Sequence, residues 1–257
     1  HHISDPKLAK EIFSDINTTG RAQNAVTSYL ANGYGIVAAQ DQIWETQRRF
    51  TLRKLRDVGV LKSSIEEFIM KETATLTDFF KERVGKPIPG IKLYNGPVVN
   101  ALWRTISGET IDWAALEKPA ILKSVEYLVK LPYTEAIILE TLRLSSIIPL
   151  GIPHQMLADT EFQGLFLPKG ATVVTNAYGI HYDPKIWGDD VNKFRPERFL
   201  SNDKKHVIRH EALIPFSVGR RSCIGEGFAR DVIFLFVASI LQKFNLEPDP
   251  GLSDCRY

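Results

Sequence analysis

The segment from residue 225 to residue 244 restricts the fold more than any other part of the chain. Its residues are apolar on nearly every helical face, and such a helix is stable only where neighbouring elements cover it. The chain has 257 residues, of which 44% are hydrophobic and 24% are charged. A chain of this size and composition can build a core that buries the helix.

Hydrophobic periodicity predicts helices through most of the chain. Besides the last helix, they are expected from Pro6 onward and over residues 40–58, 63–84, 98–106 and 131–144. Residues 160–175 form short β-prone runs separated by turn signals, which predicts strands. A coil rich in Asp, Pro, Trp and Arg follows over residues 182–216. The expected class is therefore mainly α with small β-sheets.

Charge and hydropathy exclude two classes of partner. The 32 Lys and Arg residues are nearly balanced by 30 Asp and Glu residues, so no basic footprint for nucleic acid is present. The longest apolar run, residues 232–241, is about half of the roughly twenty residues that a membrane-spanning helix needs. No transmembrane anchor is therefore expected in this chain.

The sharpest chemical feature is Cys223, which lies in the segment 216–225. Two arginines precede it and a predicted helix begins just after it, and both favour the thiolate over the thiol. A thiolate can act as a nucleophile or as a metal ligand, and a lone cysteine can also be structural. A nucleophile needs a positioned base, and neither His206 nor His210 has a recognisable signature. For a metal ligand, glycines at 219 and 225 would let the backbone approach a flat ligand.

The segment resembles the haem-binding loop of cytochromes P450. The family pattern is Phe-x-x-Gly-x-Arg-x-Cys-x-Gly, and its fixed residues here are Phe216, Gly219, Arg221, Cys223 and Gly225. The resemblance implies a P450 fold that binds haem b (iron protoporphyrin IX), with these five residues in contact with the haem. It also implies that the Cys223 thiolate is the axial ligand of the iron.

Two other patterns agree with this resemblance. Glu140 and Arg143 resemble the Glu-x-x-Arg helix of the family, and residues 194–199 resemble its Pro-Glu-Arg-Phe segment. The resemblance implies that Glu140, Arg143 and Arg198 form a buried network that holds the coil beneath the haem. An exposed pair at this spacing would contribute little to stability.

Further residues resemble partners of the haem propionates. Trp44 and Arg48, four positions apart, resemble the Trp-x-x-x-Arg helix of the family, and Arg221 is its usual third contact. His154 lies where many animal microsomal members carry a histidine that reaches a propionate. The alternatives are core packing for Trp44 and a solvated helix face for Arg48.

The resemblance implies a haem-thiolate monooxygenase that inserts one oxygen atom from O2 into a small lipophilic substrate. Its electrons would come from an NADPH-dependent reductase, and it would associate with the endoplasmic reticulum membrane, as expected of the animal microsomal branch. No side chain is assigned a separate catalytic role.

The chain is shorter than a full family member. We expect residues 1–257 to form a single, incomplete P450 domain that lacks the amino-terminal segment and a central block, with a deletion junction within residues 111–130. The missing block would contain the helix over the distal face of the haem, and residues 107–110 match that helix only out of register. The alternative is therefore a non-catalytic haem-binding remnant, from a truncated isoform or an incomplete gene model.

Overall fold

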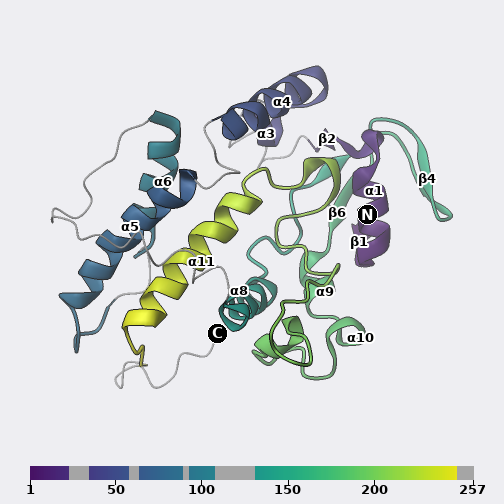
Figure 1. Ribbon diagram of the computed structural model, residues 1–257. Helices are drawn as coiled ribbons and strands as arrows, with labels where there is room; N and C mark the ends of the chain where they lie inside the picture. Colours follow the sequence, from purple (N-terminus) through teal and green to yellow (C-terminus); the bar gives the residue numbers. More distant parts are fainter. Residues whose placement is uncertain (23–34, 58–63, 89–92, 108–130, 248–257) are drawn as a thin grey trace. The chain divides into compact units, whose positions relative to one another are not determined.

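The computed structural model describes residues 1–22, 35–57, 64–88, 93–107 and 131–247 (Figure 1). The chain divides into two compact units. The first contains residues 1–54 and 135–226, and the second contains residues 55–134 and 227–257. Each unit has its own hydrophobic core.

The first unit contains a four-stranded sheet made of very short strands. In sheet order they are β1 (His2–Ile3), β6 (Thr172–Thr175), β3 (His154–Gln155) and β2 (Gly20–Arg21). β1 runs parallel to β6, whereas β3 is antiparallel to both β6 and β2. The register places Arg21 opposite His154, so two residues 133 positions apart in the sequence become neighbours.

A separate hairpin of the first unit consists of β4 (Thr160–Phe162) and β5 (Leu165–Leu167). Its two-residue turn has φ angles of 50° at Gln163 and 80° at Gly164. Positive φ at both central residues is the geometry of a type I′ turn, whose twist matches that of the flanking strands.

The helices of the first unit are mostly short. They are α1 (Pro6–Ser14), α3 (Gly35–Ala38), α9 (Ala177–His181), α10 (Pro184–Trp187) and most of α4 (Asp41–Asp57) and α8 (Pro132–Ser145), with 3-10 segments at Ile16–Thr18, Pro196–Phe199 and Gly219–Arg221. The start of α1 follows from its sequence, because the Asp5 side chain accepts a hydrogen bond of 2.7 Å from the Leu8 N–H. Pro6 occupies the first turn, where no N–H donor is needed.

Two hydrophobic clusters stabilise the first unit. One lies between α1 and the sheet and includes Ile12, Phe13 and Val173. The other surrounds α8 and α9 and includes Leu139 and Ile180. Because α8 is held by the second cluster, its polar residues have fixed positions from which to bind the coil that follows.

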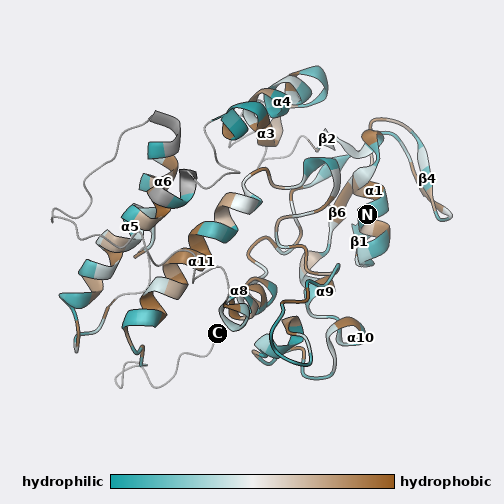
Figure 2. Ribbon diagram, in the orientation of Figure 1, coloured by the Kyte–Doolittle hydropathy of each residue, from teal (hydrophilic) through white to brown (hydrophobic). Residues whose placement is uncertain are grey.

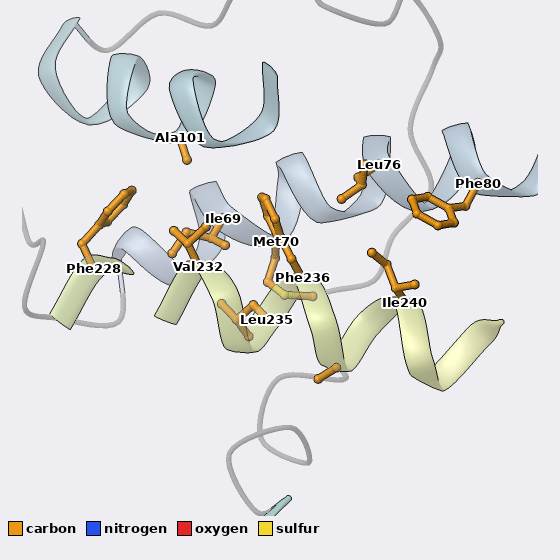
Figure 3. Close-up of a cluster of buried hydrophobic side chains, with 11 residues drawn as sticks. Ile69, Met70, Leu76, Phe80, Ala101, Phe228, Val232, Leu235, Phe236 and Ile240 are labelled. Carbon is orange, nitrogen blue, oxygen red and sulfur yellow. The ribbon is translucent and has the colours of Figure 1, made fainter. Parts of the chain in front are cut away.

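The second unit contains α5 (Ser64–Lys81), α6 (Asn95–Ser107) and nearly all of α11 (Glu226–Lys243). Phe228, Val232, Phe236 and Ile240 of α11 are buried in the same cluster as Ile69 and Leu76 of α5 and Ala101 of α6 (Figure 3). Apolar residues also occupy other faces of α11 (Figure 2), where Phe234 is partly buried. The expected all-round apolar helix is therefore present, with its most deeply buried face toward α5 and α6.

The structure confirms the expected class of a mainly α protein with small sheets, and it corrects two details. β1 and β2 lie outside residues 160–175, where strands are expected, and the expected coil after residue 182 contains α10 and the 3-10 segment Pro196–Phe199. Two-residue strands have no periodicity to detect, and α10 depends on the local Asp183 cap. The expected junction within residues 111–130 lies outside the described residues. In the part of the chain that is described, no helix is long and apolar enough to cross a membrane.

Candidate functional site

The first unit contains a cavity of about 240 Å³, several times the volume of a water molecule. Its polar lining includes Arg21, Arg48, His154, Arg221 and Cys223, and apolar side chains such as Ile148, Ile152, Ala177 and Ile214 form much of the remaining wall. The cavity thus brings together residues from α4, β2, β3 and the cysteine loop, defined here as residues 216–225.

The cysteine loop presents the thiol of Cys223, which is free and exposed, to this cavity. The Cys223 N–H donates a hydrogen bond of 2.9 Å to the carbonyl of Phe216, which closes the loop. On the other side, Arg48 Nη2 donates to the carbonyl of Ser222 at 3.0 Å. The backbone on the amino-terminal side of the thiol is therefore held by hydrogen bonds, and the sulfur atom is accessible.

Gly219 allows a close packing contact between the cysteine loop and α1. Its φ angle is 76°, and a Cβ atom at this position would lie 1.9 Å from the carbonyl oxygen of Phe13. The missing side chain thus lets the cysteine loop pack on the end of α1. At Gly225 a Cβ atom would lie 3.9 Å from the Cys223 Sγ, which is an ordinary contact.

Arg221 lies in the wall of the cavity and is held mainly by backbone carbonyls. Its Nε and Nη2 donate to the carbonyl of Thr19 at 2.8 and 2.5 Å, and Nη2 also donates to Ala39 at 2.8 Å. The guanidinium carbon lies 3.9 Å from the ring centre of Trp44. Burial, with the positive charge of Arg21 nearby, lowers the pKa of Arg221 to about 9, so it remains charged at neutral pH.

Arg21 is a site residue that the sequence did not reveal. It is 3% exposed, lines the cavity, and donates from Nε to the carbonyl of Val37 at 2.9 Å. Burial, followed by repulsion from Arg48, lowers its pKa to about 10. Its position depends on the pairing of β2 with β3, and a two-residue strand leaves no pattern in the sequence that could have marked it.

The three arginines give the cavity a positive character. Burial lowers the pKa of Arg48, and the negative charge of a Cys223 thiolate opposes this shift. Among the described residues, no carboxylate forms an ion pair with Arg21, Arg48 or Arg221. Buried charges are usually paired, so this cluster fits a ligand that supplies negative charge.

Trp44 gives a second indication of a missing acceptor. Its ring is 5% exposed, and within the described part of the chain its Nε1–H is a buried donor with no hydrogen-bond partner. Buried indole N–H groups normally have an acceptor. Trp44 lines the same cavity as the arginines, so the site combines an orphaned donor with three cations.

His154 completes the polar wall. It is 4% exposed, its Nδ1 lies 2.7 Å from the carbonyl oxygen of Thr18, and its ring makes an edge contact with Phe13 at 4.4 Å. Burial, together with the charges of Arg21 and Arg221, lowers its pKa to about 3. The ring is therefore neutral at physiological pH in the structure described.

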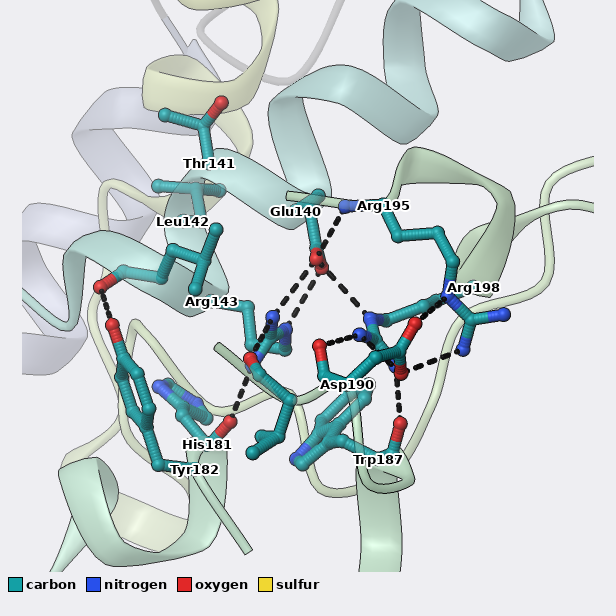
Figure 4. Close-up of polar contacts among 12 residues, drawn as sticks. Glu140, Thr141, Leu142, Arg143, His181, Tyr182, Trp187, Asp190, Arg195 and Arg198 are labelled. Atoms are coloured by element: carbon teal, nitrogen blue, oxygen red, sulfur yellow. Dashed lines mark hydrogen bonds and ion pairs between the residues drawn. The ribbon is translucent and has the colours of Figure 1, made fainter. Parts of the chain in front are cut away.

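Glu140, Arg143 and Arg198 lie in one network (Figure 4). The Glu140 carboxylate accepts two hydrogen bonds of 2.8 Å from Arg143 Nε and Nη2 and one of 3.2 Å from Arg198 Nε. Glu140 and Arg143 are fully buried, and the Arg198 side chain is 3% exposed. The backbone N–H of Arg195 adds a fourth hydrogen bond to Glu140, of 3.0 Å.

The same network binds the coil that follows α9. Arg143 donates to the carbonyls of His181 at 2.7 Å and Val191 at 2.8 Å. Arg198 donates to the carbonyl of Trp187 and to that of Asp190 at 2.6 Å. These bonds attach a segment with little regular structure to the rigid helix α8.

The sequence of this chain matches a known family along almost its whole length. The profile of the family described as "Cytochrome P450" matches residues 1–130 and residues 123–256. These two ranges include every residue of the cavity and of the buried network.

Individual relatives support this match. Farnesoate epoxidase from Bombyx mori is 46% identical over 136 residues, which are 49% of this chain and 27% of that protein. Cytochrome P450 2D15 from Canis lupus familiaris is 43% identical over 122 residues, and cytochrome P450 1A1 from Rattus norvegicus is 45% identical over 125 residues. The matched segments span about a quarter of the length of these relatives. Because the family profile covers nearly all of its sequence, the chain belongs to the cytochrome P450 family.

Proposed function

We propose that this chain binds haem b with the Cys223 thiolate as the axial ligand of the iron. We further propose that the protein acts as a monooxygenase, inserting one oxygen atom from O2 into a lipophilic organic substrate. The observation that carries the proposal is the exposed thiol of Cys223 in a cavity with three arginines that have no carboxylate partner among the described residues. A dianionic porphyrin with a metal that accepts a thiolate satisfies both features.

The residues of the cavity divide into two groups toward such a ligand. Arg21, Arg48 and the unpaired Trp44 Nε1–H offer donors for its carboxylates, as charge-assisted hydrogen bonds of this kind are strong. Arg221 donates most of its hydrogen bonds to backbone carbonyls. It would therefore act on the ligand mainly through its positive charge. The apolar side chains of Ile148, Ile152 and Ala177 line the same cavity and suit the body of the porphyrin ring.

The chain's own residues hold and orient the sulfur. The carbonyl of Phe216 accepts the Cys223 N–H, and Arg48 binds the carbonyl of Ser222, so the loop backbone is fixed before a ligand enters. When bound, haem supplies the activation of O2, which thiolate ligation favours by donating electron density to the iron. The network of Glu140, Arg143 and Arg198 acts at a distance, by fixing the coil of the same unit.

The proposed substrate and partners rest on the family match. Farnesoate epoxidase is named for the oxidation of a lipophilic acid, and we propose a small lipophilic substrate here as well. Electrons would come from an NADPH-dependent reductase, and the protein would associate with the endoplasmic reticulum membrane.

The test is expression of the chain with a haem precursor, followed by the spectrum of the reduced carbon-monoxide complex. Thiolate ligation gives a red-shifted Soret band, and Cys223→Ala should abolish it. The matched control is Cys255→Ala, which removes the other cysteine of the chain and should leave the band unchanged.

Two results would change the proposal. A red-shifted band that persists in Cys223→Ala would show that another residue is the ligand. Haem retention with the expected band, but without oxidation of any lipophilic substrate in the presence of reductase, would favour the non-catalytic haem-binding remnant over the monooxygenase.

A further inference from the structure

We infer that the carboxylates of the porphyrin bind to this cavity together with one proton, which is taken up from solvent at Nε2 of His154. The inference rests on the proposed function, because the ligand it concerns is the porphyrin. It adds that His154 changes its protonation state at Nε2 when the ligand binds, which neither the fold nor the family match shows.

The hydrogen bond of His154 to the backbone determines which ring nitrogen carries the proton. A backbone carbonyl oxygen can only accept, so the 2.7 Å contact between His154 Nδ1 and the Thr18 oxygen requires a proton on Nδ1. In the neutral ring the other nitrogen, Nε2, then carries a lone pair. A carboxylate is also only an acceptor, so neutral His154 cannot donate a hydrogen bond to it.

Two positive charges act on His154. Arg21 lies opposite it on β2, and Arg221 acts on it from the 3-10 segment Gly219–Arg221. α1 contributes only the uncharged ring of Phe13. Burial and these two cations account for the lowered pKa of His154, and the hydrogen bond to Thr18 opposes them only in part.

Arg48 on α4 is also a cation of the cavity. Its charge adds to the positive potential there, because it lowers the pKa of both Arg21 and Arg221. The carboxylate of Asp41 opposes the shift of Arg221, and among the described residues no carboxylate forms an ion pair with the three arginines. The cluster is therefore short of negative charge before a ligand binds.

A ligand with two carboxylates favours protonation of His154. Two negative charges offset the repulsion from Arg21 and Arg221 and attract a proton directly, since charges interact more strongly at a buried site than in water. Protonation of Nε2 turns a repelling lone pair into a charge-assisted donor. In this step one proton leaves the solvent and an N–H bond forms at Nε2, without transfer of electrons.

Metal-free protoporphyrin IX is the probe that tests this inference. It carries the carboxylates but no iron, so Cys223 does not have to lose a proton to a metal when it binds. Calorimetric titration between pH 6 and pH 8, in buffers of different ionisation enthalpy, counts the protons taken up. The unmutated chain should take up close to one proton more than His154→Gln at the acidic end of this range. Because the proton is bound in the complex, affinity should fall as pH rises, by up to tenfold per pH unit.

The dimethyl ester of protoporphyrin IX is the matched control, since it lacks the negative charges. It should bind without uptake of a proton at His154, and the comparison of acid and ester on the unmutated chain needs no variant to fold. Equal proton counts for acid and ester, or for the unmutated chain and a folded His154→Gln, would overturn the inference.

The result is separate from the test of the axial ligand. Proton uptake with protoporphyrin IX, combined with a red-shifted band that persists in Cys223→Ala, would refute the assignment of Cys223 alone. The red-shifted band together with equal proton counts would refute the proton uptake alone. If neither porphyrin nor haem binds, both proposals are wrong.

Discussion

Arg48 donates a hydrogen bond of 3.0 Å to the carbonyl of Ser222, the residue before Cys223. The two residues are 174 positions apart, yet this bond joins one of the three cations of the cavity to the backbone of the cysteine loop. The same guanidinium also lies 6.0 Å from the ring centre of Trp44. A single side chain therefore couples the position of the thiol to that of the positive wall.

The buried network should behave as one unit when it is mutated. Removing Glu140, Arg143 or Arg198 leaves buried charge without a partner, and each alanine variant should lose about 3–5 kcal/mol of unfolding free energy. A double variant of Glu140 and Arg143 should lose little more than either single variant, because the interaction is already absent. Unfolding in urea measures these losses.

The control for the network lies on the same helix. Glu135 forms an ion pair of 3.1 Å with Arg209, whose side chain is 64% exposed, and exposed pairs contribute about 0–1 kcal/mol. Glu135→Ala should therefore have a small effect. Losses of similar size for Glu135→Ala and Glu140→Ala would contradict the special role of the buried network.

Gly219→Ala should separate the cysteine loop from α1. The new Cβ atom would overlap the Phe13 carbonyl, and the positive φ angle alone costs a side chain about 1–2 kcal/mol. Gly164→Ala is the matched control, because Gly164 has a φ angle of 80° with nothing within 4 Å of the added atom. We expect a clearly larger loss of stability and of haem retention for Gly219→Ala. Equal losses would mean that the contact with α1 is unimportant.

His181 should contribute to a loss of stability in acid. Its Nε2 accepts a hydrogen bond of 3.0 Å from the Ile214 N–H, and its Nδ1 lies 2.8 Å from Ser146 Oγ, so the buried ring must be neutral. Burial, followed by the charge of Arg143, lowers its pKa to about 4. An unfolded histidine binds its proton near pH 6.5, so the unfolded chain takes up a proton that the folded chain excludes.

The unfolding free energy should decrease as pH falls from about 6.5 to about 4, and the contribution of His181 over this range is about 3 kcal/mol. His181→Gln, whose amide does not titrate, should make the decrease shallower although it lowers stability at pH 7. Part of the decrease should remain, because the lowered pKa of His154 acts in the same direction. Urea unfolding at several pH values measures both curves. If the two curves keep the same slope, His181 is not the group responsible.

The exposed cations of α4 should contribute to docking of the reductase. Arg53 and Arg56 are exposed, and electrostatic attraction to an acidic partner weakens as salt screens it. The double variant Arg53→Glu/Arg56→Glu should bind the reductase more weakly, with most of the difference lost at high salt. Binding is measured by titration at several ionic strengths.

A control with the same change in net charge is Lys204→Glu/Lys205→Glu, on an exposed loop. It should have a smaller effect, because it leaves α4 unchanged. Equal weakening by both double variants would indicate a dependence on overall charge rather than docking at α4.

The longer elements could be predicted from the sequence because they are encoded locally. The expected helix over residues 63–84 corresponds to α5 (Ser64–Lys81), and the one over residues 131–144 corresponds to α8 (Pro132–Ser145). Their apolar residues repeat at helical spacing, and proline marks the beginning of α8. The strands β1 and β2 could not be predicted, since their pairing depends on β6 and β3 more than 100 residues away.

The site was predictable only in part, for a related reason. Arg48, Arg221 and Cys223 belong to motifs with fixed spacing, so the resemblance identified them and the structure places them on one cavity. Arg21 reaches that cavity only through the register of β2 with β3, which no local spacing records. The proton on His154 Nδ1 likewise depends on Thr18, 136 positions away.

The contacts of residues 2–14 have a consequence for biosynthesis. β1 pairs with β6, and the end of α1 packs against Gly219, so residues 2–14 are made well before these partners. At about 5–20 residues per second, α1 is translated on the order of 10–40 s before Gly219. During this interval its apolar face, including Ile12 and Phe13, has no native partner in the cysteine loop, and it is a candidate for chaperone binding.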